Sequence, residues 1–185
     1  MRLTITSLLL LASGSALADN NQIDLDQVLA ASQGVLHLNV SAGAFNQSTN
    51  LTALSLSCDS SNNTRASVSQ SQRNRLVDMT PMQSSIALTN GSLSNNSGVL
   101  SASLIAGNLN QSANITEIGA GPGLSELDDS ALSQQNSSIV SANTFATRRI
   151  AISKDSLKGN KGITQVTAIS GNINKTSNHI SINLP

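Results

Sequence analysis

The sequence contains almost no aromatic residues. Phe45 and Phe145 are the only two, and Trp and Tyr are absent from all 185 residues. Transmembrane β-barrels carry girdles of aromatic side chains at both membrane interfaces, and proteins that bind single-stranded nucleic acid or sugars commonly stack them on aromatic rings. The scarcity of rings therefore argues against all three classes.

Charged residues are scarce as well. They make up 11% of the sequence, 10 basic residues balance 10 acidic ones, and no basic run is longer than Arg148-Arg149. Nucleic acids and anionic membranes bind concentrated positive charge. The sequence therefore predicts no nucleic-acid partner and a surface made mainly of Ser, Thr, Asn and Gln.

Cysteine occurs once, at Cys58. A single thiol excludes the internal disulfide framework of many small exported proteins. Cys58 follows Leu54 and Leu56 at alternate positions of an expected strand, which favours a buried small side chain. An intermolecular disulfide or a reactive thiol is the alternative.

Residues that bind metals or perform catalysis are few and scattered. His37 and His179 are the only imidazoles, and they occupy different positions of the repeat described below. Glu126, Asp128 and Asp129 form a short acidic segment without the spacing of a calcium loop. No nucleophile motif accompanies them. We therefore expect no metal, no cofactor and no enzymatic activity.

The N-terminal segment 1–18 has the pattern of a secretory signal. Arg2 is the only charge, Leu8-Leu9-Leu10-Leu11 forms a short apolar run, and Ala16-Leu17-Ala18 offers small residues for cleavage. The apolar run is too short to span a bilayer. We expect cleavage after Ala18, no membrane insertion afterwards, and export to the cell surface or medium, with the periplasm as the alternative.

The sequence does contain one segment, or block, that is repeated in three similar copies. The copies start at Gly34, Gly98 and Gly162, evenly spaced by 64, and read GVLHLNVSAGAFNQSTN, GVLSASLIAGNLNQSAN and GITQVTAISGNINKTSN. A repeat in strict register is an architectural unit. It divides the chain into a signal peptide (1–18), an N-terminal cap or partial repeat (19–33), repeat 1 (34–97), repeat 2 (98–161) and a truncated repeat 3 (162–185).

Each block predicts two strands joined by a turn. In the first copy, apolar residues Leu36, Leu38 and Val40 alternate with polar His37 and Asn39, as in a strand with two different faces. A G-x-[FLI]-N turn and a second alternating segment follow, which indicates a β-arch or a hairpin. Segments with weaker similarity between the copies bring the predicted total to about four strands per repeat.

The predicted fold class is therefore all-β, with the repeats arranged either as a β-solenoid or as two packed sheets. A short helical turn within residues 23–31 is the only helical alternative.

The best-kept positions of the repeat are one glycine and two asparagines. In a solenoid these side chains stack into hydrogen-bonded ladders that template assembly. The alternative is a solvated turn, chosen because Gly and Asn reach positive φ readily. The candidate ladder residues are Gly43, Asn46, Asn50, Gly107, Asn110, Asn114, Gly171, Asn174 and Asn178.

These turns resemble the repeats of curlin-like and related functional-amyloid proteins of bacterial surfaces. The shared pattern is G-x-x-N followed after one residue by a small side chain, here Ser48, Ser112 or Thr176. Two glutamines typical of curlin repeats are not kept, and the period is longer than that of curlin repeats. The pattern is also similar to that of short exported adhesin-like proteins of Gram-negative bacteria. The resemblance implies a component of the cell surface or biofilm matrix.

We therefore predict an exported structural or interaction protein, either adhesin-like or curli-like. Its expected partners are further copies of itself or other matrix and surface proteins, because open strand edges at the ends of a repeat array can pair with another chain. The alternative is a monomeric secreted binding module for a polysaccharide or a surface protein.

Overall fold

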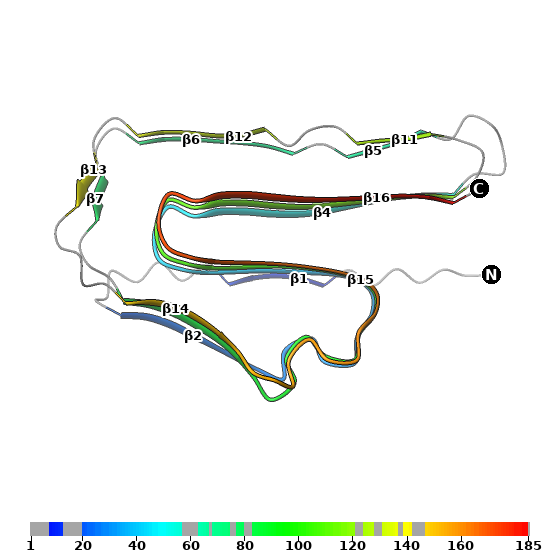
Figure 1. The fold of residues 1–185 in the computed structure, drawn as a ribbon, viewed down its shortest axis with the longest axis horizontal. Helices are drawn as coiled ribbons and strands as arrows, with labels where there is room; N and C mark the ends of the chain where they lie inside the picture. Colours follow the sequence, from blue (N-terminus) through cyan, green and yellow to red (C-terminus); the bar gives the residue numbers. More distant parts are fainter. Residues whose placement is uncertain are drawn as a thin grey trace.

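The computed structural model describes residues 8–12, 20–56, 63–66, 68–74, 77–79, 83–120, 124–127, 131–136, 139–141 and 147–184. Within these ranges every regular element is a strand (Figure 1), which confirms the predicted all-β, repetitive class. No helix of the described residues is long and apolar enough to cross a membrane. Cys58, Asp128, Asp129 and most of the predicted signal peptide lie outside the described residues.

The described residues form the strands β1 to β16. In chain order they are β1 Leu8–Ala12, β2 Asn20–Asp26, β3 Gln33–Ala42, β4 Gln47–Leu56, β5 Asn63–Ala66, β6 Ser69–Asn74, β7 Val77–Met79, β8 Gln83–Thr89, β9 Ser97–Ala106, β10 Gln111–Ala120, β11 Leu124–Leu127, β12 Ala131–Asn136, β13 Ile139–Ser141, β14 Arg148–Ile152, β15 Lys161–Ser170 and β16 Lys175–Leu184.

The long strands form three stacked rungs. The first rung comprises β2, β3 and β4 (20–56), the second β8, β9 and β10 (83–120), and the third β14, β15 and β16 (147–184). Equivalent strands pair in parallel, in the orders β3-β9-β15, β4-β10-β16 and β2-β8-β14. Each rung therefore lies on the previous one, and the stack builds three sheets that run along its axis (Figure 1).

The stacking register follows the sequence period. Leu36 pairs with Leu100, and Leu100 pairs with Thr164, so the offset between rungs equals the spacing of the repeated blocks. In β2 the offset is one less, since Ile23 pairs with Ile86. It returns to the full period after the following turn, where the Leu93 amide donates to the carbonyl oxygen of residue 28. The helical turn considered for residues 23–31 is wrong, because β2 continues to Asp26 and residues 27–31 form a bend and turn with positive φ at Gln27, Leu29 and Ala31.

The two strands of each block form a β-arch rather than a hairpin, because β3 and β4 belong to different sheets. The arch residue Phe45 has a left-handed backbone, with a φ of 56°, and Leu109 and Ile173 repeat it at 58° and 60°. Such values are unusual for large side chains. Three nearly equal values show that stacking imposes the same backbone on all three copies.

Shorter strands connect the rungs. β5, β6 and β7 lead from the first rung to the second, and β11, β12 and β13 lead from the second to the third, each pairing with its counterpart. Figure 1 shows β5, β6, β11 and β12 as an additional layer beside the β4-β10-β16 sheet. One period thus runs through the strands β3 to β8, more than the four or so that the sequence predicts.

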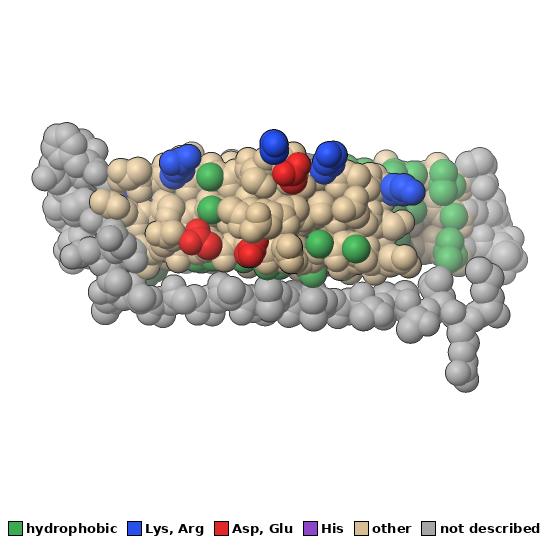
Figure 2. Space-filling view, turned by 90° about the horizontal axis from the view of Figure 1, so that it is seen from below, with side chains coloured by type: hydrophobic (Ala, Val, Ile, Leu, Met, Phe, Trp, Pro, Cys, Tyr) green, Lys and Arg blue, Asp and Glu red, His purple; other side chains and the backbone are tan. Residues whose placement is uncertain are grey.

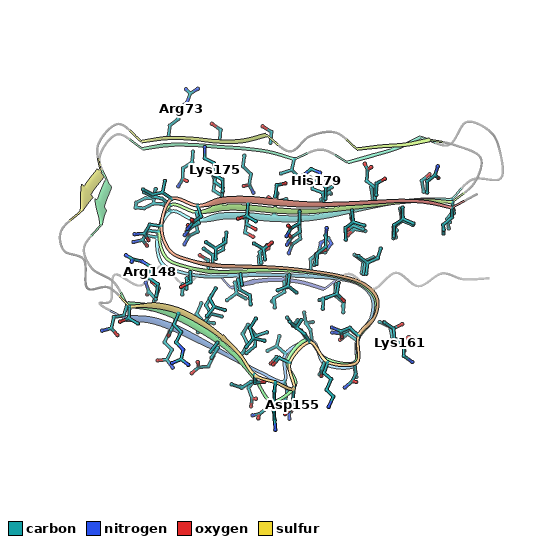
Figure 3. The ribbon with its side chains drawn as sticks, in the orientation of Figure 1. Arg73, Arg148, Asp155, Lys161, Lys175 and His179 are labelled. Atoms are coloured by element: carbon teal, nitrogen blue, oxygen red, sulfur yellow. The ribbon has the colours of Figure 1, made fainter. Side chains whose placement is uncertain are left out.

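Two different interiors lie on the two faces of the β3-β9-β15 sheet (Figure 3). The even-numbered side chains Leu36, Leu38 and Val40 are buried against Ile86 and Leu88 of the β2-β8-β14 sheet in the main apolar core. The odd-numbered side chains His37 and Asn39 face β4 and are polar, and they bond to Thr52, Ser48 and Asn50 of that strand. The alternation predicted for this segment is therefore present, with an apolar side and a polar side that are both packed.

The strand β1 falls inside the predicted signal peptide. It pairs with the outer edge of β3, from Leu8 with Leu36 to Ala12 with Val40. In the full chain it therefore covers half of the β3 edge that faces away from the second rung.

Candidate self-association interface

The first asparagine of each turn joins the rungs in one continuous ladder. The backbone amide and Nδ2 of Asn110 both donate to Oδ1 of Asn46, over 3.0 and 2.9 Å. Asn174 makes the same two bonds to Oδ1 of Asn110, over 3.0 and 2.9 Å. Each asparagine therefore caps the backbone of the next rung as well as its side chain.

The second asparagine forms a parallel ladder in the polar interior. Nδ2 of Asn114 donates to Oδ1 of Asn50 over 2.9 Å, and Nδ2 of Asn178 donates to Oδ1 of Asn114 over 3.0 Å. Side chains of the facing strand join it, since the Thr167 hydroxyl donates to Oδ1 of Asn114 over 2.8 Å. The ladder thus binds the β4 sheet to the β3 sheet.

The turn glycines Gly43 and Gly107 allow the rungs to approach closely. A Cβ atom added to Gly43 would lie 2.0 Å from the Gly107 carbonyl oxygen, and one added to Gly107 would lie 1.7 Å from that of Gly171. Both distances are far inside van der Waals contact. The structure thus brings all nine candidate residues into one stacked arch, with the glycines beside the asparagine ladder.

Three further ladders are formed by residues outside the candidate set. Nε2 of Gln111 donates to Oε1 of Gln47 over 2.8 Å, and the Asn108 amide donates to Oδ1 of Asn172 over 2.8 Å. Residue 44, the equivalent of Asn108 in the first copy, is alanine, which hid this position. These positions can be recognised in the sequence because the same residue type recurs at the repeat spacing, but in only two of the three copies.

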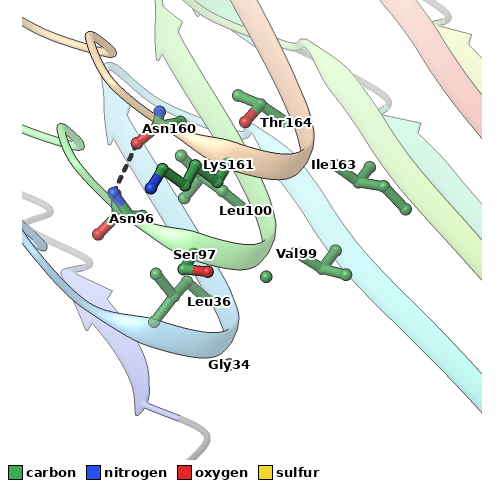
Figure 4. Close-up of a pocket in the computed structure, with 11 residues that line it drawn as sticks. Gly34, Leu36, Asn96, Ser97, Val99, Leu100, Asn160, Lys161, Ile163 and Thr164 are labelled. Carbon is green, nitrogen blue, oxygen red and sulfur yellow. Dashed lines mark hydrogen bonds between the residues drawn. The ribbon is translucent and has the colours of Figure 1, made fainter.

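The third of these ladders lies at the bend before β3, β9 and β15. There the Asn96 amide donates to Oδ1 of Asn160 over 2.8 Å (Figure 4). Oδ1 of Asn96 in turn accepts from the Ser32 amide over 2.8 Å. The space beside the bend, lined by Leu36, Leu100 and Thr164 among others, is too narrow for a water molecule, so the ladder residues pack closely there.

Side chains of the middle rung are more deeply buried than their equivalents on the two end rungs. Asn110, Asn114 and Thr116 on the second rung are 0% exposed. Their equivalents on the first and third rungs are half-buried or, in the case of Asn174, exposed. Because the residue types are largely the same, the difference comes from having a neighbour on two sides rather than on one.

The ladders end in complementary groups. Among the described residues, no group donates to Oδ1 of Asn174 and the backbone amide of Asn46 finds no acceptor. These are the acceptor and the donor that pair between rungs inside the chain. A second copy placed on the third rung in the same register would bring them together.

One imidazole lies in the polar interior. Nε2 of His37 is 2.9 Å from Oγ1 of Thr52, and burial lowers the pKa of His37 below its ordinary value of 6.5. The neutral form is therefore favoured. Its equivalents on the other rungs are Ser101 and Gln165.

Nothing in the described part of the chain gathers the ligands of a metal site, since no three His, Cys, Asp or Glu residues lie together there. What the arrangement offers chemically is a strand edge at each end of the stack, open except where β1 covers half of β3, with ladder groups at both ends. Such edges bind other strands.

Comparison with known families agrees with this geometry. Residues 10–185 match the model of the functional amyloid protein FapB/FapC family. No solved structure matches the chain. The match confirms the resemblance to functional-amyloid repeat proteins and makes the chain a structural component of the cell surface or biofilm matrix. The chain therefore belongs to the functional amyloid protein FapB/FapC family.

Proposed function

We propose that the chain is a fibril subunit that adds three rungs to a continuous stack. The third rung of one copy receives the first rung of the next, in the register that already joins the rungs within the chain. The ladder residues from Gly43 to Asn178 then extend along the whole fibril, and the fibril serves the extracellular matrix as a structural element.

The observation that carries this proposal is the difference in burial between equivalent residues. Asn110 is fully buried between two rungs, whereas Asn174 is exposed for lack of one. A buried amide that lacks a partner destabilises by about 1–3 kcal/mol, and each completed hydrogen bond contributes about 0.5–1.5 kcal/mol net. Stacking a further copy gives every end group the surroundings of the second rung.

The apolar residues of the outer sheet also match across the proposed joint. Ile150 and Ile152 of β14 lie in register with Ile86 and Leu88 of β8, and these pair with Ile23 and Leu25 of β2. Continuing the stack places Ile23 of the next copy beside Ile150 and Leu25 beside Ile152. The apolar core thus continues across the joint without a change of residue class.

Export and cleavage belong to the same proposal. β1 lies on the β3 edge that the joint requires, so removing residues 1–18 uncovers this edge for the preceding copy. The periplasm is a transit compartment in this scheme, and the surface or matrix is the destination. Adhesion to other surfaces would be a property of the assembled fibril rather than of a catalytic site.

The test starts from the exported form, purified in denaturant and diluted into buffer. We expect fibrils in electron micrographs, thioflavin T fluorescence, and fibre diffraction at about 4.7–4.8 Å along the axis, the spacing of stacked strands. A product that stays monomeric and dye-negative, yet binds polysaccharide or a surface protein, would instead support the secreted binding module.

A further inference from the structure

The three rungs carry very different charges. On the first rung the only charged residues are Asp24 and Asp26, and on the second the only one is Glu117. The third rung carries six basic residues and one acidic residue, Asp155. The basic residues are Arg148, Arg149, Lys154, Lys158, Lys161 and Lys175. The formal charge therefore runs from −2 through −1 to +5 along the stack.

Part of this gradient, Asp24 and Asp26 on β2 and Arg149 on β14, lies on the β2-β8-β14 sheet. Figure 2 shows basic side chains along one long edge of the outer face of this sheet, and carboxylates both among them and toward the other edge. Asp24, Asp26 and Arg149 are all exposed. A groove of about 350 Å³ runs between them, lined by Asp24 on β2, Ser85 and Ala87 on β8, and Arg149 on β14.

Within one chain these opposite charges are held apart by the uncharged strand β8. Neighbouring strands lie about 4.8 Å apart, and Asp24 is level with Ala87 whereas Arg149 is level with Ser85, so two strand spacings and two residues along the strand separate them by roughly 12 Å. This is close to the Debye length at about 0.1 M salt, so their attraction inside the subunit is weak.

A joint between copies brings the same charges one strand apart. Arg149 pairs with Ser85, and Ser85 pairs with Gln22. Continuing the stack thus places Gln22 of the next copy beside Arg149, with Asp24 two residues farther along the same face. A diagonal neighbour of this kind lies about 7–8 Å away, within reach of a long side chain.

The second acidic residue meets a lysine in the same way. Asp26 pairs with Thr89, and the Ser153 amide donates to the Leu88 carbonyl, which places Ser153 at the level of Thr89. The next copy's Asp26 therefore arrives beside Ser153 and its neighbour Lys154.

We propose, on the basis of the fibril function proposed above, that charge complementarity fixes the order of assembly. The basic third rung of one copy recognises the acidic first rung of a second copy. The partner is another molecule of this chain, in head-to-tail order. Contacts between two third rungs would oppose five net positive charges with five more, and contacts between two first rungs would oppose Asp24 and Asp26 with themselves. Both like-end contacts are therefore disfavoured.

The test uses seeded elongation of the exported form, with seeds and monomers of the same variant, at low salt and at high salt. D24K/D26K makes both ends basic, and R149E/K154E replaces two cations of the third rung by anions. Each should elongate about tenfold more slowly than the wild type at low salt, since steering by charge changes association rates by factors of roughly 10 to 1,000. At high salt, near 1 M, the difference should shrink to about twofold, because the Debye length falls to about 3 Å and the charges are screened.

The quadruple variant D24K/D26K/R149E/K154E decides between steering and simple damage. It restores opposite signs at the two pairs that meet across the joint, position 24 with position 149 and position 26 with position 154, so we expect its low-salt rate to return to within about threefold of the wild type. R73E is the control for a charge reversal away from the joint. Arg73 lies on β6, away from the outer face of the β2-β8-β14 sheet (Figure 3), and its reversal should leave the rate unchanged.

The outcomes separate the two proposals. If the wild type forms no fibrils, the proposed function fails. If the wild type and all charge variants elongate at equal rates, charge does not direct the order of assembly. The same conclusion follows if the quadruple variant is as slow as the double variants. In both cases fibrils still form, so the proposed function stands and only this inference is overturned.

Discussion

The middle rung and the end rungs carry nearly the same residues in different surroundings. Asn110 bonds to a rung on either side, whereas Asn174 bonds to a rung on one side only. The residues of the repeat therefore form their full set of hydrogen bonds only when a rung is stacked on both sides. A single chain satisfies that requirement only in its second rung, and assembly extends it to the other two.

The largest effect is expected where two rungs come closest. Gly107→Ala places a methyl group 1.7 Å from the Gly171 carbonyl oxygen, a contact that only movement of the backbone relieves. We expect this variant to form no fibrils, as measured by dye fluorescence and electron microscopy.

Gly91→Ala is the matched control for this prediction. Gly91 also has a positive φ, of 77°, but the nearest atom to its added Cβ is the Ser94 hydroxyl at 3.2 Å. This variant should lose only about 1–2 kcal/mol to backbone strain and still assemble. Equal behaviour of the two variants would contradict the close approach of the rungs.

The second prediction compares the same side chain on two rungs. Asn110→Ala and Asn174→Ala should lower the stability of assembled fibrils by similar amounts, about 2–4 kcal/mol each, because both asparagines are then buried between rungs. Denaturant titration of the fibrils measures this. If Asn174→Ala is harmless in fibrils while Asn110→Ala is not, the third rung remains an end, and the stacking model is wrong.

The third prediction concerns a charge that the middle rung buries. Glu117 is 0% exposed, and neither of its carboxylate oxygens has a hydrogen-bond partner in the part of the chain that the structure describes. Its rung equivalents are Ala53 and Ser181. Glu117→Ser should therefore stabilise the fold by about 1–3 kcal/mol. A raised midpoint of denaturation checks this, and Ser181→Ala serves as a control that should change little.

The smallest effect is a dependence on pH. The pKa of His37 is lowered by burial, so the unfolded chain binds more protons than the folded one just below pH 6.5, and stability falls as the pH falls through that range. His37→Ser, which copies the second-rung residue Ser101, should flatten this dependence. Denaturation midpoints at about pH 7.5 and about pH 5.5 test it. An unchanged slope would mean that other groups dominate.

Much of the scaffold could be predicted from the sequence. The spacing of the three blocks became the stacking register, and the alternation around Leu36 and Leu38 gave the apolar face. The G-x-[FLI]-N segments became arches because only Gly tolerates the close approach at residues 43 and 107.

The polar interior could not be predicted in the same way. Alternation distinguishes two faces of a strand but does not say whether the polar face meets water or another sheet. Asn50 illustrates this, because its side chain bonds to Asn39 across the arch as well as to the Asn114 side chain on the next rung. The strands β5 to β7 were also hard to predict, since their short polar segments carry only faint repeats.

The positions of the charged residues could be read from the sequence, but their role in assembly could not be predicted from it. Asp24 and Arg149 are far apart in the chain, and only the stacking direction places them on opposite ends of one sheet. Whether opposite ends meet depends on how copies join.

The contact between Asn174 of one copy and Asn46 of the next tests the central claim most directly. Fibrils grown from a mixture of ¹⁵N-labelled and ¹³C-labelled chains report contacts between molecules by solid-state NMR. We predict a cross-peak between the Asn46 backbone amide nitrogen of one chain and the Asn174 side-chain carbonyl carbon of another, together with one between Asn50 and Asn178. Fibrils that lack both cross-peaks, or that show Asn46 next to Asn46 of another chain, would contradict head-to-tail stacking of the rungs.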